Sequence, residues 1–120
     1  MIDIVFSRYP NGSHIATLQC SGHAGFDDGE GLDLVCAAVS ALTGALGLGL
    51  TEKIQPPLQV MVGDGHFSLD LRPQQVNPPA HLLVDTITFS LIQLAQNYPG
   101  FCSVREQKLE EVADIGKRKA

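Results

Sequence analysis

The stretch that organises the chain runs from Gly22 to Ser40 and reads GHAGFDDGEGLDLVCAAVS. His23 ends an alternating run of residues, and a glycine-rich acidic loop follows it. Asp33 then opens an apolar run that carries Cys36 in its first helical turn. A thiol and a proton acceptor at the two ends of one loop predict a cysteine nucleophile with a histidine base.

The residues around Cys36 have the chemistry that a nucleophilic thiol needs. Asp33 is a favoured N-cap residue, and its carboxylate can accept the backbone N–H of Cys36. Cys36 then lies at the positive end of a helix, where the reactive thiolate form is stabilised. Because the Asp33 carboxylate opposes a second negative charge, the thiol needs a partner such as His23. Ser40 lies one turn beyond Cys36 on the same helical face, where it can orient the thiol or a substrate carbonyl.

Each of these residues also has a purely structural interpretation. Cys36 lies in an apolar run, where cysteine often acts as a small core hydrophobe. Asp33 is equally suited to be only a helix cap, and His23 to be an ordinary histidine at the end of a strand. The acidic loop is either a solvated loop or a flap whose carboxylates meet a basic peptide. Its residues are Gly25, Phe26, Asp27, Asp28, Gly29, Glu30 and Gly31.

The same stretch resembles the signature of the ribosomal-processing cysteine protease (Prp) family, through Gly-His-Ala followed by Gly-x-Asp-x-Val-Cys-Ala-Ala-Val-Ser. The resemblance covers about residues 1 to 109. It implies that His23 and Cys36 are the catalytic pair and that Asp33 and Ser40 support them. It also implies a homodimeric cysteine endopeptidase that removes the N-terminal extension of the twenty-seventh large-subunit ribosomal protein through a thioester. The loop from Asp27 to Gly31 is one residue longer than the family's usual pattern.

Length and composition limit the possible classes of protein. A chain of 120 residues suits one domain, which we place at residues 1–110, followed by a mobile tail at residues 111–120. The 8 basic and 13 acidic residues give a net charge of -5, which argues against direct nucleic-acid binding and favours a basic peptide partner. The three cysteines, Cys20, Cys36 and Cys102, have neither a disulfide-framework nor a zinc spacing. We therefore expect reduced thiols, no metal and no cofactor.

The sequence also predicts a location. The N-terminus lacks the basic and then apolar pattern of a secretory signal. The most apolar run, residues 36–50, is short for a membrane span and rich in small and polar residues. We therefore expect a cytoplasmic protein.

Hydrophobic periodicity predicts the order of the secondary structure. Alternation indicates strands over residues 2–8, 14–21, 58–62, 66–71 and 102–107, and helical spacing indicates helices over 33–50 and 77–97. Asn77 and the two prolines after it are typical of a helix start. The order β-β-α-β-β-α-β predicts a two-layer α+β domain with a mostly antiparallel sheet, two helices and an edge strand at the end.

The sequence favours structural roles for several histidines and an aspartate outside residues 22–40. His66 and Asp70 share the outer face of one predicted strand, which favours surface residues over a metal pair. His14 and His81 are also expected at the surface. Two other functions stay open, namely a non-enzymatic ribosome- or RNA-binding module and a redox-sensing thiol protein in which Cys36 pairs with Cys20.

Overall fold

The computed structural model describes residues 1–12, 14–22 and 34–113. Within these ranges one sheet contains β1 (Ile2–Arg8), β2 (Ile15–Ser21), β3 (Met61–Gly63), β4 (His66–Asp70) and β5 (Cys102–Glu106). The helices are α1 (Leu34–Leu48), the π-helical turn η1 (Gly49–Lys53), α2 (Pro78–Asn97) and the 3-10 turn η2 (Leu109–Glu111).

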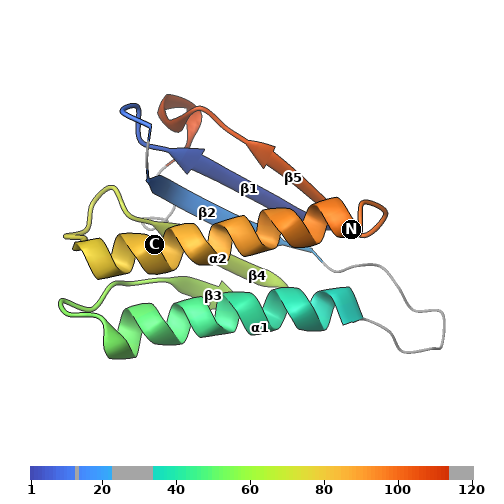
Figure 1. The fold of residues 1–120 in the computed structure, drawn as a ribbon, viewed down its shortest axis with the longest axis horizontal. Helices are drawn as coiled ribbons and strands as arrows, with labels where there is room; N and C mark the ends of the chain where they lie inside the picture. The colour runs from blue at the N-terminus through green and yellow to red at the C-terminus, as the bar shows by residue number, and fades with distance from the viewer. Residues whose placement is uncertain (13, 23–33, 114–120) are drawn as a thin grey trace.

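The five strands are arranged in the order β3-β4-β2-β1-β5. Strand β5 pairs with β1 in parallel, and the other neighbours are antiparallel. Helices α1 and α2 lie side by side over one face of the sheet (Figure 1). This arrangement confirms the predicted two-layer α+β fold, the mostly antiparallel sheet and the position of β5 at an edge.

The core lies between the sheet and the two helices. In β1, Ile2, Ile4 and Phe6 are buried, as their two-residue spacing predicts. The strand register places Cys102 opposite Ile2 and Cys20 opposite Ile4. The helix-facing side of the sheet therefore carries two thiols at the end where α1 begins.

Helix α1 is longer than its sequence suggested, because η1 continues it to Lys53. The combined helix Leu34–Lys53 is long and apolar enough, by length and composition, to cross a membrane, in contrast to the expectation from residues 36–50. A core helix of a globular protein can meet the same criterion, and 33% of its most apolar window is buried. Its buried apolar residues, which belong to the core cluster, are Val35, Val39, Leu46 and Leu50.

The β3–β4 hairpin is confirmed, but β3 is shorter than the predicted strand at residues 58–62. Leu58 donates its backbone N–H to the Leu50 carbonyl at 3.0 Å, and Gln59 donates to Gln74 Oε1 at 2.7 Å. These two N–H groups are therefore not available to pair with β4. Ladder pairing begins only at Met61, opposite Ser68.

The expectation that Asp70 is a surface residue is wrong. Asp70 is 6% exposed, and Arg72 Nη2 donates to its Oδ2 at 2.7 Å. Arg72 also donates to the carbonyls of Val112 and Ala113, at 3.2 and 3.0 Å. Val112 and Ala113, near the start of the predicted tail, thus lie against the arginine that neutralises Asp70, whereas residues 114–120 are outside the described ranges.

Candidate active site

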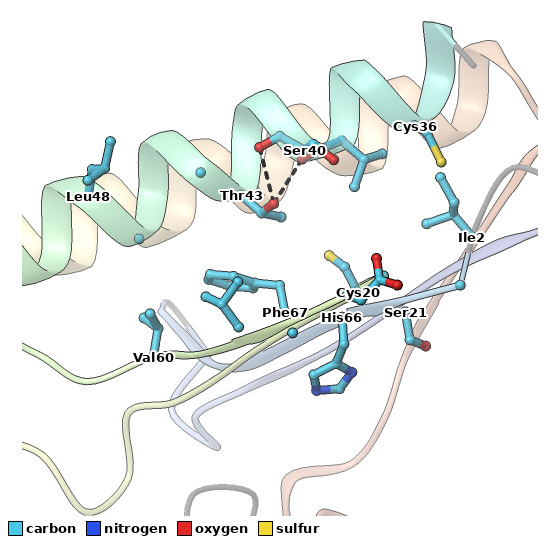
Figure 2. Close-up of a pocket in the computed structure, with 18 of the residues that line it drawn as sticks. Ile2, Cys20, Ser21, Cys36, Ser40, Thr43, Leu48, Val60, His66 and Phe67 are labelled. Atoms are coloured by element: carbon cyan, nitrogen blue, oxygen red, sulfur yellow. Dashed lines mark hydrogen bonds between the residues drawn. The ribbon is translucent and has the colours of Figure 1, made fainter. Parts of the chain in front are cut away.

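Cys36 is the third residue of α1 and is half-buried. The first turn of a helix carries N–H groups without intrahelical acceptors, so negative charge is stabilised there. The thiol points down from the helix toward Ile2 on β1 (Figure 2). Cys36 therefore combines the helix position predicted for a nucleophile with an opening toward the sheet.

A cavity of about 580 Å³ lies beside this thiol, between α1 and the sheet. Its volume is in the range of ligand pockets. Cys36, Ser40, Thr43 and Gly47 line it from the helix, and Cys20 and Phe67 line it from the strands (Figure 2). The structure therefore brings Cys36 and Ser40, two of the predicted site residues, to one wall of one cavity.

Cys20 and Cys102 differ from Cys36 in their surroundings. Each is 3% exposed in the core. Burial, with a smaller contribution from the neighbouring Cys102 thiol, raises the pKa of the Cys20 thiol to about 12. Burial also raises the pKa of the Cys102 thiol, with Cys36 adding to the rise and the N-terminal amine opposing it. Both core thiols are therefore held protonated, which makes them poor nucleophiles toward an oxidised Cys36.

The backbone that leads to His23 is fixed by Gly22. This glycine has φ +99°, and its N–H donates to the Gly65 carbonyl at 2.9 Å. A Cβ at this position would lie 2.5 Å from the Met1 carbonyl oxygen. The chain therefore leaves β2 at a position that only glycine fits, one residue before the predicted base.

Several predicted site residues lie outside the described ranges. They are His23, Asp33 and the predicted flap, which consists of Gly25, Phe26, Asp27, Asp28, Gly29, Glu30 and Gly31. The pairing of His23 with Cys36 and the cap at Asp33 therefore remain predictions from the sequence.

Among the described residues that line the cavity, the histidine is His66. It pairs with Ser21, whereas the next pair in the ladder is Cys20 with Phe67. Because successive side chains of a strand point to opposite faces, the His66 ring points to the other face of the sheet from Phe67, away from α1 and Cys36 (Figure 2). His66 is therefore not placed to act as the base for Cys36.

The described residues contain no cluster of three His, Cys, Asp or Glu side chains that can hold a metal ion. His66 and Asp70 lie at opposite ends of β4, and Asp70 is paired with Arg72. The floor of the cavity was not recognised in the sequence, because Phe67 belongs to a strand remote from Cys36 along the chain. Its alternation with Leu69 and Leu71 predicted burial but not the element that would cover it.

A two-layer α+β domain with a reduced thiol at a helix start, beside a cavity large enough for part of a peptide, has the parts of a thiol-dependent hydrolase. The family model described as cysteine protease Prp matches residues 1–103. The chain therefore belongs to the cysteine protease Prp family, and it is a cysteine protease.

Solved structures share this fold. The S. aureus ribosomal processing protease Prp with a covalently linked product peptide is 22% identical, with a TM-score of 0.74 over 89% of this chain and 100% of that chain. The same protease with a substrate peptide is 21% identical, with a TM-score of 0.73 over 89% and 100%. SMU.848 from Streptococcus mutans is 26% identical, with a TM-score of 0.74 over 90% and 98%. No curated relative matches the sequence significantly.

Proposed function

We propose that this cysteine protease removes the N-terminal extension from the precursor of the twenty-seventh large-subunit ribosomal protein. The observation that carries the proposal is the position of Cys36, half-buried at the start of α1 and open to a cavity of about 580 Å³. The S. aureus relatives, described as ribosomal processing proteases and bound to peptides, support a ribosomal precursor as the substrate. An extended N-terminal segment has the shape that the space between α1 and the β3–β4 hairpin can hold.

The reaction begins when the Cys36 thiolate attacks the carbonyl carbon of the scissile peptide bond. His23 takes the thiol proton and later gives it to the leaving amine. The C–N bond then breaks, the amine product leaves, and the acyl part stays on Cys36 as a thioester. Water, activated by His23, attacks the thioester and regenerates the thiol. Asp33 caps the helix and Ser40 orients the carbonyl, and no metal or organic cofactor takes part.

The negative charge that develops on the carbonyl oxygen during the attack needs hydrogen-bond donors to stabilise it. The N–H groups of the first turn of α1 lack intrahelical acceptors and point toward the helix start, where Cys36 lies. They are suited to stabilise the oxyanion as the thiolate attacks. The acidic residues Asp27, Asp28 and Glu30 act as a flap that attracts a basic peptide.

We further propose that the protein acts in the cytoplasm as a homodimer, without binding nucleic acid directly. The net charge of -5 supports the absence of a nucleic-acid footprint. The outward face of α1 exposes Leu34 and Leu48, at 76% and 66%. Between them the exposed positions include Ala37, Ala41 and Ala45. An apolar face of small side chains is suited to a second copy of the same helix.

The proposal is tested with the purified protein and a synthetic peptide that contains the extended N-terminus of that ribosomal protein. Mass spectrometry follows the products from the native protein and from the Cys36→Ala and His23→Ala variants. We expect a single cut by the native protein and a loss of at least a hundredfold in rate in both variants. His66→Ala is the matched control, because its ring points away from α1 and Cys36, and it should cleave at the native rate.

Three other outcomes would reject parts of the proposal. Equal cleavage by the two variants would reject the site and indicate a contaminating protease. Tight binding of the peptide by the native protein without any cut would favour the binding-module alternative. Loss of cleavage in His66→Ala but not in His23→Ala would reject His23 as the base and assign that role to His66.

A further inference from the structure

The cavity extends well beyond the thiol, and its far part is shaped by glycines. Gly44 and Gly47 lie three residues apart on α1, so they share a helical face, and both line the cavity. Phe67 on β4 and Val60 lie opposite them. The side of the cavity away from Cys36 is therefore bounded on the helical side by the backbone of the two glycines, flanked by Leu48 and Thr51, and by apolar side chains on the other.

Packing among the described residues does not require these two glycines. A Cβ at Gly44 would meet no atom of the described residues within 4 Å. A Cβ at Gly47 would lie 3.7 Å from both Phe67 Cε1 and Val60 Cγ2, which is ordinary van der Waals contact. Gly49 differs, because a Cβ there would lie 2.6 Å from Leu83 Cδ2 on α2. The close approach of α1 and α2 thus explains Gly49 but neither Gly44 nor Gly47.

A glycine inside a helix lowers stability by roughly 0.5–1 kcal/mol relative to alanine. At Gly44 and Gly47 the described neighbours do not compensate for this loss, since a Cβ fits at both positions. What the glycines do provide is space in the cavity. Their effect is therefore on the size of the group that the cavity can receive.

The distance from Cys36 decides which part of a peptide reaches this space. With a rise of about 1.5 Å per residue, Gly44 lies roughly 12 Å beyond Cys36 along the helix. An extended peptide advances about 3.3 Å per residue, and a large side chain reaches several ångströms further. The second or third residue from the scissile bond is therefore the one whose side chain enters the space beside Gly44.

From this geometry we infer that the space between Gly44, Gly47 and Phe67 is a specificity pocket for a large apolar side chain of the substrate, aromatic or branched. Gly44 and Gly47 determine the size of this pocket. The inference rests on the proposed peptidase site at Cys36, and it adds the residues that select the substrate. The selected side chain belongs to the second or third residue from the bond that is cut.

The test measures alkylation of Cys36 by short reactive peptides, which does not require cleavage of a peptide bond. Triglycine chloromethyl ketones represent the acyl side of a substrate, and iodoacetyl-triglycine amides represent the amine side. Each series includes the parent peptide and three peptides with one phenylalanine, at the first, second or third residue from the reactive carbon. Mass spectrometry gives the rate of labelling at Cys36.

In one of the two series, we expect phenylalanine at the second or third residue to label Cys36 at least tenfold faster than the parent peptide. Gly44→Leu should reduce this ratio to near one without changing the rate of the parent, because leucine fills the open space. Gly47→Ala should reduce the ratio partially. Gly100→Leu is the matched control, since Gly100 also has no atom within 4 Å of a Cβ but does not line the cavity, and it should keep the native ratio.

The inference is overturned if no phenylalanine peptide exceeds its parent or if only the first residue gives a gain. It is also overturned if the native ratio survives in Gly44→Leu or is lost in Gly100→Leu. Circular dichroism on each variant verifies the fold. If the protein selects these peptides but does not cut the ribosomal precursor, the pocket is supported and the proposed substrate is rejected. If it cuts the precursor without this selection, the proposed substrate is supported and the pocket is rejected.

Discussion

Gly22 shows how one residue can fix the backbone at the start of the predicted catalytic loop. Its φ of +99° lies in the region that favours glycine, and the Met1 carbonyl occupies the space of a side chain. The residue that follows it is His23. Any side chain at position 22 would therefore move backbone at the point where the predicted base begins.

Gly22→Ala should lower the free energy of unfolding by several kcal/mol, because a Cβ would lie 2.5 Å from a backbone oxygen. Gly12→Ala is the control. Gly12 has φ +94° but no atom within 4 Å of a Cβ, so it suffers only the conformational cost of about 1–2 kcal/mol. Urea unfolding measures both values. Equal losses would show that the Met1 carbonyl moves away without cost.

A cluster of side chains around His14 and His81 joins the β1–β2 turn to the first turns of α2. The rings of His14 and His81 stack with centroids 4.1 Å apart. His14 Nδ1 lies 2.8 Å from Asp85 Oδ2, and the edge of Tyr9 faces His81. The expectation that both histidines are simple surface residues therefore missed a contact between segments about 70 residues apart, which no local pattern contains.

This contact predicts a loss of stability in acid. Burial, and then the neighbouring His14, lower the pKa of His81 from 6.5, while Asp85 opposes them. The unfolded chain therefore binds a proton at His81 at a higher pH than the folded protein does. Stability should fall as the pH decreases from about 6.5 toward the lower pKa of the folded state.

Urea unfolding across pH 5 to 8 measures this effect. The His81→Phe variant keeps an aromatic ring beside His14 and Tyr9 but does not titrate, so its stability should decrease less between neutral and acidic pH than that of the native protein. His66→Phe, remote from the cluster, should leave the native pH dependence unchanged. The same dependence in native protein and His81→Phe would assign the acid sensitivity to other groups.

Among the elements, α2 has the clearest local determinants. Asn77 accepts the Ala80 N–H at 3.2 Å, and its amide donates to the Gln55 carbonyl at 2.5 Å. Asn77→Ala should therefore lower the free energy of unfolding by about 1–2 kcal/mol. Asn97→Ala, at the exposed last residue of α2, should change it by less than about 0.5 kcal/mol. Chemical unfolding compares the two, and equal effects would mean that the cap contributes nothing.

Local patterns predicted most elements because each has one buried face. The alternation of Ile2, Ile4 and Phe6 and the capped start at Asn77 are both present in the structure. Remote hydrogen bonds account for the differences. Leu58 and Gln59 bond to the end of the helix and to Gln74 and so shorten β3, and Arg72 makes Asp70 a buried residue.

Local patterns also predicted part of the candidate site. Cys36 and Ser40 are one helical turn apart, so their shared wall follows from the helix alone. The opposite wall comes from Cys20 and Phe67, which are brought under α1 by the order of strands in the sheet. Pairing between remote strands determines that order, and the spacing of residues along the chain does not contain it.

For the molecule as a whole, the two layers leave one face of α1 uncovered by the residues that the structure describes. The sheet buries Val35, Val39 and Leu46, while the opposite side of the helix exposes Leu34 and Leu48. In the proposed homodimer this outward face is covered by a second copy. The site then belongs to the same helix as the proposed interface, and the two surfaces meet at Leu48, which also lines the cavity.

The outward face of α1 gives the prediction for assembly. Ala41 is exposed between the two leucines, and an arginine there would put an unpaired charge into the proposed interface. Sedimentation should show a dimer for the native protein at micromolar concentration and a dimer dissociation constant at least tenfold higher for Ala41→Arg. Gln96→Arg, on the exposed side of α2, should remain dimeric. A native monomer, or a dimer that tolerates Ala41→Arg, would exclude this face, since a guanidinium cannot be buried between two apolar helices without a large loss of solvation.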